Sequence, residues 1–368
     1  MKVPLSITNL QPQEIKLVSD SLKTGWLTHG KQNLIFENKF SNYIGVKYSV
    51  SMNSCTSALE CAVKLLKKKG EIIIPSWTWV STANAVINAG CKPVFADIEL
   101  NSRNIDPEEI KKKISKRTVA VIIVHFGGMP CKMDDINKIC KIKNITLIED
   151  SAETIGGEFK KKRTGSFGIG CFSFFPTKNI TTTEGGMLTT NNPKHFNYVK
   201  KLIAHGIQKN VKFPWKREAI LPGHNFRMPN HLAALGVSQL RKLELFNKKR
   251  NEIAKSYNKF FNNFPNIIET QSVPKNIKHS YQMYTLRVKK NLRNSFLNYL
   301  NKNDIEASVH FFPPLHKQKY LSKFNKNKLK NTEILMNDII TLPMSPHLTE
   351  RQIKYVKDIS LKWLKKSK

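Results

Sequence analysis

The chain has 368 residues, 40% of them hydrophobic, and carries 61 Lys and Arg against 27 Asp and Glu, a formal net charge of +34 at pH 7. This length provides for a substantial core and two domains, and the composition excludes a disordered chain. The longest apolar runs are strand-sized, and the first ten residues lack the apolar core of a signal peptide. We therefore expect a cytoplasmic protein with no membrane segment.

The high positive charge raises the question of a nucleic-acid partner. The lysines are spread along the chain in short runs such as Lys67 to Lys69 and Lys160 to Lys162, without a long basic arm or a nucleic-acid motif. We interpret the charge as a solvated surface with a general attraction for anionic, phosphate-bearing substrates, and we expect no nucleic acid as a partner.

The cysteines show neither a CxxC pair nor the spacing of metal ligands. They are Cys55, Cys61, Cys91, Cys131, Cys140 and Cys171. We expect reduced thiols and no metal site.

Two helices are predicted before the first strand. Residues 12–24 have the spacing of an amphipathic helix, with Ile15, Val18 and Leu22 on one side. A second helix is predicted over roughly 34–43, and it leads into a strand.

The strand over 48–52 is followed by a turn of small residues, Ser54, Cys55 and Thr56, and by a helix from Ala58. The start of such a helix offers free backbone N–H groups and the positive end of the helix dipole, which suits a phosphate. Ser and Thr are also ordinary helix caps, so the turn alone does not decide between the two.

Short strands rich in β-branched residues alternate with helices through the first half of the chain. We predict strands at 71–75, 93–98, 119–126 and 146–149, and helices at 107–114 and 133–141. This alternation predicts a mostly parallel sheet covered on both faces, with the ligand beside the carboxyl ends of the strands.

Three side chains at these strand ends suggest chemistry. Trp79 could stack on a planar ligand or pack in the core. Asp150 follows a buried strand and could cap a helix or face a protonated ring nitrogen. Lys178, in FSFFPTKNITTTEGG, has mostly uncharged neighbours. Burial there would favour the neutral amine, a nucleophile toward an aldehyde, whereas the alternative is a surface lysine on a loop.

The second half of the chain predicts a smaller α/β domain. We expect a large domain over 1–245 and a small domain over 246–368. Further predicted elements are helices at 196–204 and 231–245, a long connecting helix at about 244–261, a linker at 264–278, a strand at 281–288 and a helix at 295–301. The run GSFGIG lacks the order of a dinucleotide-binding loop.

Nine motifs in one order cover nearly the whole chain. They are GWLTHG, SCTSAL, PSWTWVSTANAV, NIDPEEI, HFGGMPCKMD, EDSAE, FSFFPTKNITTTEGG, HNFRMPNHLAALGVSQL and FPPLH. Together they resemble the DegT/DnrJ/EryC1/StrS family of sugar aminotransferases, within the fold-type I superfamily. The resemblance implies pyridoxal 5'-phosphate as cofactor, and an α/β fold with a mostly parallel sheet sandwiched by helices plus a smaller C-terminal α/β domain.

The resemblance also implies roles for individual residues around the cofactor ring. Lys178 would hold the cofactor through a Schiff base and shuttle protons. Asp150 would keep the ring nitrogen protonated, and Trp79 would stack on the ring. Glu153 would lie near the ring hydroxyl, where relatives carry His, Gln or Glu, so its role stays open.

The cofactor phosphate would be bound by Ser54, Cys55, Thr56 and Ser173. Cys55 is a mild departure from the family, which carries Gly or Ala there. Asn225 would reach the cofactor phosphate of the neighbouring subunit, which implies a homodimer with active sites at the subunit interface.

The implied reaction moves an amino group from L-glutamate to a keto group of a nucleotide-linked keto-deoxy sugar. The segment around FPPLH favours C4 of a 4-keto-6-deoxy sugar, as in perosamine- or viosamine-type synthases. His310, His316 and Tyr320 would contact the sugar or its diphosphate, unless they are structural. The pathway would build lipopolysaccharide, O-antigen or another polysaccharide.

Two alternatives stay open. Relatives of the same fold with histidine in place of the lysine are nucleotide-sugar 3-dehydratases, and Lys178 argues against that branch. A non-catalytic binding or regulatory protein, associated with nucleic acid through the positive charge, would leave Trp79, Asp150 and Lys178 unexplained. The sequence does not distinguish UDP, dTDP and GDP.

Overall fold

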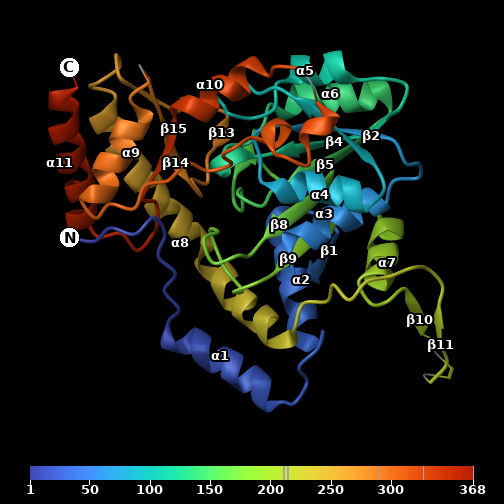
Figure 1. The fold of residues 1–368 in the computed structure, drawn as a ribbon. Helices are drawn as coiled ribbons and strands as arrows, with labels where there is room; N and C mark the ends of the chain where they lie inside the picture. The colour runs from blue at the N-terminus through green and yellow to red at the C-terminus, as the bar shows by residue number, and fades with distance from the viewer. Residues whose placement is uncertain (210–211, 214, 290, 326, 368) are drawn as a thin grey trace.

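A seven-stranded sheet forms the centre of the molecule (Figure 1). This computed structural model describes residues 1–209, 212–213, 215–289, 291–325 and 327–367. In spatial order the strands are β1 (Tyr48–Met52), β9 (Gly186–Thr190), β8 (Ile169–Ser173), β5 (Thr146–Asp150), β4 (Thr118–Val124), β2 (Glu71–Pro75) and β3 (Lys92–Ala96). Strand β9 runs antiparallel to both of its neighbours and the other pairs are parallel. The predicted mostly parallel sheet is confirmed.

Successive side chains of a strand point to opposite faces of the sheet, and helices bury both faces here. Ile72, Ile74 and Ile122 pack with α3 (Cys55–Lys64), α4 (Val80–Asn88) and α7 (Pro193–Leu202). The opposite face packs with α5 (Pro107–Lys113), α6 (Met133–Lys143), α2 (Lys31–Ile44) and α8 (Asn230–Phe261). The predicted covering of both faces by helices is therefore also confirmed.

Helix α8 joins the two cores of the chain. Its 32 residues form one helix where two were predicted, at 231–245 and 244–261. Gly236 lies within this helix without interrupting it, and a side chain there would come within 2.7 Å of the Phe36 ring. The helix buries Val237 in the core against the sheet and Tyr257 in the second core.

The second core surrounds a three-stranded antiparallel sheet of β12 (Ile268–Thr270), β14 (Tyr284–Val288) and β15 (Ile339–Leu342), covered by α9 (Arg293–Lys302) and α11 (Glu350–Lys366). Val3 also packs there and pairs with Ile305. The stretch 264–278, predicted as a linker, contains the short strands β12 and β13 (Ile277–Lys278). Strand β13 extends the small sheet of β6 (Glu158–Phe159) and β7 (Lys162–Arg163).

The segment after residue 308 returns from the second core to the central sheet. Its short helices η2 (Leu315–Lys317) and η3 (Ser322–Phe324) precede α10 (Lys330–Asp338). Leu315 and Leu321 pack in the core of the large sheet. Asp97, after β3, accepts the backbone N–H of Thr332 at 2.8 Å, which holds the first turn of α10. The division of domains at residue 245 stays a prediction.

Helix α1 (Pro12–Lys23) lies along the outside of α8 (Figure 1). The predicted helix is confirmed, but its apolar side is not the packed side. Glu14 and Ser21 are buried, whereas Ile15 is 58% exposed and Leu22 is 43% exposed. The hairpin of β10 (Ile207–Lys209) and β11 (Arg217–Ala219) extends away from the body of the molecule in Figure 1.

Within the part of the chain that the structure describes, no helix is long and apolar enough to cross a membrane. The same residues contain no group of three or more His, Cys, Asp or Glu that could hold a metal ion. All six cysteines are free thiols.

Candidate active site

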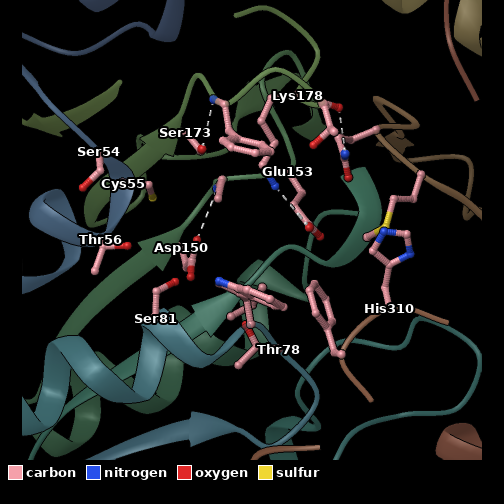
Figure 2. A pocket seen from close by; sticks show the side chains of 18 of the residues that line it. Ser54, Cys55, Thr56, Thr78, Ser81, Asp150, Glu153, Ser173, Lys178 and His310 are labelled. Atoms are coloured by element: carbon pink, nitrogen blue, oxygen red, sulfur yellow. Dashed lines mark hydrogen bonds and ion pairs between the residues drawn. The ribbon is translucent and has the colours of Figure 1, made fainter. Parts of the chain in front are cut away.

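A cavity of about 440 Å³ opens at the carboxyl ends of the strands of the large sheet. Residues from the turns after β1, β2, β5 and β8 line it, together with His310 and Phe311 from the returning segment. Figure 2 shows the turn at Ser54 on one side of the cavity, His310 on the other and Asp150 between them. Nine residues predicted for the site line this cavity: Ser54, Cys55, Thr56, Trp79, Asp150, Glu153, Ser173, Lys178 and His310.

Lys178 lies in the turn between β8 and β9, and its side chain is 15% exposed. Its Nζ is 3.3 Å from Oε1 of Glu153, and Oε2 of Glu153 accepts the backbone N–H of Gly127 at 2.8 Å. Glu153 is thus fixed by the backbone on one side and holds the amine on the other. The Lys178 amine is positioned at the wall of the cavity and is not a mobile surface group.

Asp150 ends β5 and is 5% exposed. Its Oδ2 accepts the hydroxyl of Thr82 at 2.9 Å, and its Oδ1 accepts the N–H of Ala152 at 3.2 Å. Burial raises the pKa of this carboxyl to about 6, against the lowering effect of the two donors. Among the described residues no cation lies within ion-pair distance of Asp150. Such a carboxylate suits a ligand that brings its own positive charge.

The turn after β1 can hold an anion. Ser54 caps α3, with its Oγ accepting the N–H of Ser57 at 3.1 Å. The N–H groups of Cys55 and Thr56, which precede Ser57 in the first turn, have no carbonyl partner within the helix and can face an anion. A side chain at Gly186 would overlap the backbone of Ser54, so this turn lies directly against β9. Ser173, at the end of β8, lines the same part of the cavity. Burial raises the pKa of the Cys55 thiol well above its usual value, so the thiol is protonated there.

Two aromatic rings form the opposite wall. Trp79 is 61% exposed at the start of α4, which excludes the alternative of a core tryptophan. The ring of Phe311 lies 6.3 Å from that of Trp79 and 5.7 Å from that of Phe126. Phe311 has a φ of 62°, a backbone conformation that costs free energy in a bulky residue and that the surrounding rings hold. Because the ring of Trp79 is exposed at the cavity, it can cover a flat ligand.

The three residues predicted to contact substrate lie in different places. His310 lines the cavity, its Nδ1 is 2.8 Å from Oγ1 of Thr341, and burial lowers its pKa. His316 is buried outside the cavity lining, 2.6 Å from the hydroxyl of Ser76. Tyr320 also lies outside the lining, on the surface, where its hydroxyl donates to Asn84.

Asn225 is exposed and does not line the cavity of its own chain. Its Oδ1 accepts a hydrogen bond from Arg227 at 2.9 Å. The segment is held in place by the N–H of Asn53, which donates to the carbonyl of Phe226 at 2.9 Å. Asn225 is available to another molecule, and its predicted role toward a second subunit stays a prediction.

Three further residues of the site were not predicted from the sequence: Thr82, Phe311 and Gln282. Gln282 lines the cavity and donates to the carbonyl of Thr177 at 3.1 Å, while its Oε1 is buried without a partner among the described residues. Thr82 and Gln282 give no local signal, because long-range packing brings them to the site. For Phe311 the unusual run SVHFFPPLH is a signal, although the prediction used only its histidines.

The donor set fits pyridoxal phosphate. The held amine of Lys178 suits its aldehyde, the buried Asp150 suits a protonated ring nitrogen, and the first turn of α3 suits its phosphate. Three features of the cavity therefore match three parts of one molecule.

Comparison with known proteins agrees with this geometry. A family model described as the DegT/DnrJ/EryC1/StrS aminotransferase family matches residues 8–360. An uncharacterized protein of Methanocaldococcus jannaschii is 40% identical over 361 residues, covering 93% of this chain and 92% of that protein. The UDP-4-amino-4,6-dideoxy-N-acetyl-beta-L-altrosamine transaminase of Campylobacter jejuni is 33% identical over 373 residues, covering 100% and 98%.

Among solved structures, the aminotransferase PseC of Helicobacter pylori, involved in the biosynthesis of pseudoaminic acid, matches with a TM-score of 0.94 at 30% identity. The match covers 100% of both chains. The fold, the cavity and the match over residues 8–360 together establish that this chain belongs to the DegT/DnrJ/EryC1/StrS aminotransferase family, whose members depend on pyridoxal phosphate.

Proposed function

We propose that the chain moves the amino group of L-glutamate to C4 of a nucleotide-linked 4-keto-6-deoxy sugar, in a pathway that builds a surface polysaccharide. The observation that carries the proposal is the amine of Lys178, held 3.3 Å from Glu153 at a cavity that also contains the buried Asp150. The name of the C. jejuni relative describes a 4-amino-4,6-dideoxy sugar on UDP, which supports both C4 and a nucleotide-linked substrate.

Bound pyridoxal phosphate would supply an electron sink for the loss of a proton next to the amine. The Nζ of Lys178 would hold the cofactor and, once free, take a proton from Cα of glutamate and deliver it during transfer. Asp150 would hold a positive charge at the ring nitrogen, and Thr82 would keep its carboxylate in place. Trp79 would cover the ring and exclude water from one side.

The phosphate would lie at the first turn of α3, between Ser54 and Ser173. His310 lines the cavity, and burial lowers the pKa of its imidazole, which favours the neutral form. It can therefore exchange a hydrogen bond with a sugar hydroxyl. The large positive net charge would favour the approach of a nucleoside diphosphate.

A homodimer in the cytoplasm is part of the proposal. Exposed apolar side chains gather in α1, in α2 and in the turn between them. They are Ile15, Leu17, Leu22, Trp26, Leu27 and Leu34, each at least 40% exposed. A patch of this kind suits a protein interface, and a second copy of the chain would cover it. A second copy is also what the predicted role of Asn225 toward a neighbouring cofactor phosphate requires.

The two alternatives make different predictions at Lys178. A 3-dehydratase of this fold would carry histidine there, and the positioned lysine favours amino transfer. A nucleic-acid-binding regulatory protein would have a dispensable Lys178 and a steep salt dependence of binding to DNA. The regulatory protein would also leave unexplained the buried Asp150 that shares the cavity with a positioned amine.

The test is the absorption spectrum of the purified protein with pyridoxal phosphate, before and after glutamate. We expect a near-visible band that glutamate shifts to shorter wavelength, and no completed shift in Lys178→Ala. Lys138→Ala, an exposed lysine on α6, is the matched control. Absence of the band in the wild type would refute the proposal, and DNA binding at rising salt would then be measured.

A further inference from the structure

Glu14 is a fully buried carboxylate that the proposed mechanism does not use. It lies on α1, where its Oε2 accepts the N–H of Gln11 at 2.9 Å and is 3.0 Å from Nζ of Lys242. Its Oε1 accepts the side-chain amide of Gln239, on α8, at 2.6 Å. A buried carboxylate is costly unless donors surround it, and here each oxygen has at least one.

Glu14 determines which way the amide of Gln239 points. Because a carboxylate only accepts, the NH2 group of Gln239 must face Glu14. The amide oxygen therefore faces the other way, where it accepts the backbone N–H of Thr181 at 3.3 Å. Thr181 lies three residues after Lys178, so the chain of bonds ends in the lysine turn.

The lysine turn, residues 174–185, needs such an anchor. Thr183 has a φ of 67°, which is costly for a β-branched residue, and its N–H donates to Oγ1 of Thr181 at 2.9 Å. The same hydroxyl of Thr181 donates to the carbonyl of Phe174 at 2.8 Å. Thr181 thus ties both ends of the turn, and Gln239 ties Thr181 to α8.

The space behind Lys178 is nearly filled by the N-terminal segment. A cavity of only about 20 Å³ remains there, between residues 7–9 and the lysine turn. Thr8 donates to the carbonyl of Pro176 at 2.9 Å. The N-terminal segment consequently supports the turn from outside the active-site cavity.

We propose that Glu14 is a positioning residue for Lys178, acting through Gln239 and Thr181 to hold the lysine turn at the distance from Glu153 that amino transfer needs. The effect on amino transfer rests on the proposed function, but the chain of hydrogen bonds from Glu14 to Thr181 can be tested without that function.

The design exchanges the two side chains. In Glu14→Gln, the new amide oxygen accepts from Lys242 and Gln11, and its NH2 faces Gln239, which must turn over and present its own NH2 to the N–H of Thr181. In the double variant Glu14→Gln/Gln239→Glu, the new amide at position 14 donates to the new carboxylate at position 239, whose other oxygen accepts from Thr181 again. The single variant breaks the chain of bonds and the double variant restores it.

Two measurements on the full-length holoenzyme follow. Hydrogen exchange of the peptide that contains Thr181 should become roughly tenfold faster in Glu14→Gln, as for loss of one buried hydrogen bond, and return in the double variant. The midpoint of the pH titration of the bound cofactor's absorption band should move in the single variant and return in the double. Glu37→Gln is the matched control, a buried carboxylate bonded to Ser51, and it should change neither.

Unchanged exchange in Glu14→Gln, or failure of the double variant to restore it, would overturn the hydrogen-bond chain. Faster exchange with an unmoved titration midpoint would overturn the positioning of Lys178. If the wild type shows no cofactor band, the proposed function fails, and the exchange result alone decides whether Glu14 holds the turn.

Discussion

The hydroxyl of Thr82 reaches Oδ2 of Asp150 at 2.9 Å, from a helix that follows β2, across the intervening strand β4. The bond stabilises the ionised carboxylate, so its removal should raise the pKa of Asp150 further above 6. We expect Thr82→Val to bind pyridoxal phosphate about tenfold more weakly at pH 7, as for loss of a bond to a charged group. Thr82→Ser keeps the hydroxyl and should bind like the wild type. Equal affinities of the Val and Ser variants, titrated by absorption, would contradict this.

Asp150 should destabilise the cofactor-free protein at neutral pH. Its pKa is about 6 in the folded chain, against an ordinary value of 3.8, so the folded state binds more protons between these values. Stability then falls as pH rises from about 4 to 6 and stays lowered above, by on the order of 3 kcal/mol. We expect Asp150→Asn to raise the free energy of unfolding of the cofactor-free protein at pH 7.5, and much less at pH 4.5. Urea unfolding at both pH values is the measurement. An equal increase in the free energy of unfolding at pH 7.5 and at pH 4.5 would count against the burial of the charge as the cause.

His310 and His316 should behave oppositely when changed to alanine. His310 lines the cavity, so His310→Ala should raise KM for the nucleotide sugar about tenfold while glutamate still shifts the cofactor band. His316 is 2.6 Å from Ser76 and 3.4 Å from Glu333, so His316→Ala should lower stability by about 1–3 kcal/mol and leave KM unchanged. Steady-state kinetics and thermal unfolding of both variants separate the roles. A raised KM in His316→Ala alone would reverse the assignment.

The apolar patch of α1, α2 and the turn between them should hold two copies of the chain together. A charge at an exposed position costs a monomer little, but a charge buried at an interface without a partner costs several kcal/mol. We expect Leu22→Asp to shift the protein from dimer to monomer in light scattering, with its thermal stability as monomer kept. Ile142→Asp is the matched control, an apolar position on α6 that is more exposed than Leu22. A dimer that survives Leu22→Asp would exclude this patch as the interface.

The central sheet could be predicted because its strands are buried on both faces. Such strands appear in the sequence as continuous runs of β-branched residues. The bounds of β2 are the predicted ones, 71–75, and each end of β4 lies within two residues of its predicted position. Parallel strands also place their following turns at one edge of the sheet, so the order of strands and turns along the chain is enough to assign Asp150 and Lys178 to one cavity.

Elements whose environment comes from distant parts of the chain could not be predicted. The periodic Ile15 and Leu22 of α1 suggest an inward apolar side, but Glu14 finds donors on α8 and takes the buried position. Phe311 reaches the cavity only because residues after 308 return to the large sheet. The sequence predicts two helices across 231–261, whereas the backbone forms one helix whose buried side passes from one core to the other.

The position of the amino terminus has a practical consequence for protein engineering. Val3 packs in the second core and Thr8 holds the turn of Lys178, while the last turn of α11 lies at the edge of the molecule, at the end of that helix away from the amino terminus (Figure 1). Affinity tags and fusion partners therefore belong after α11, away from the segment that supports the turn of Lys178.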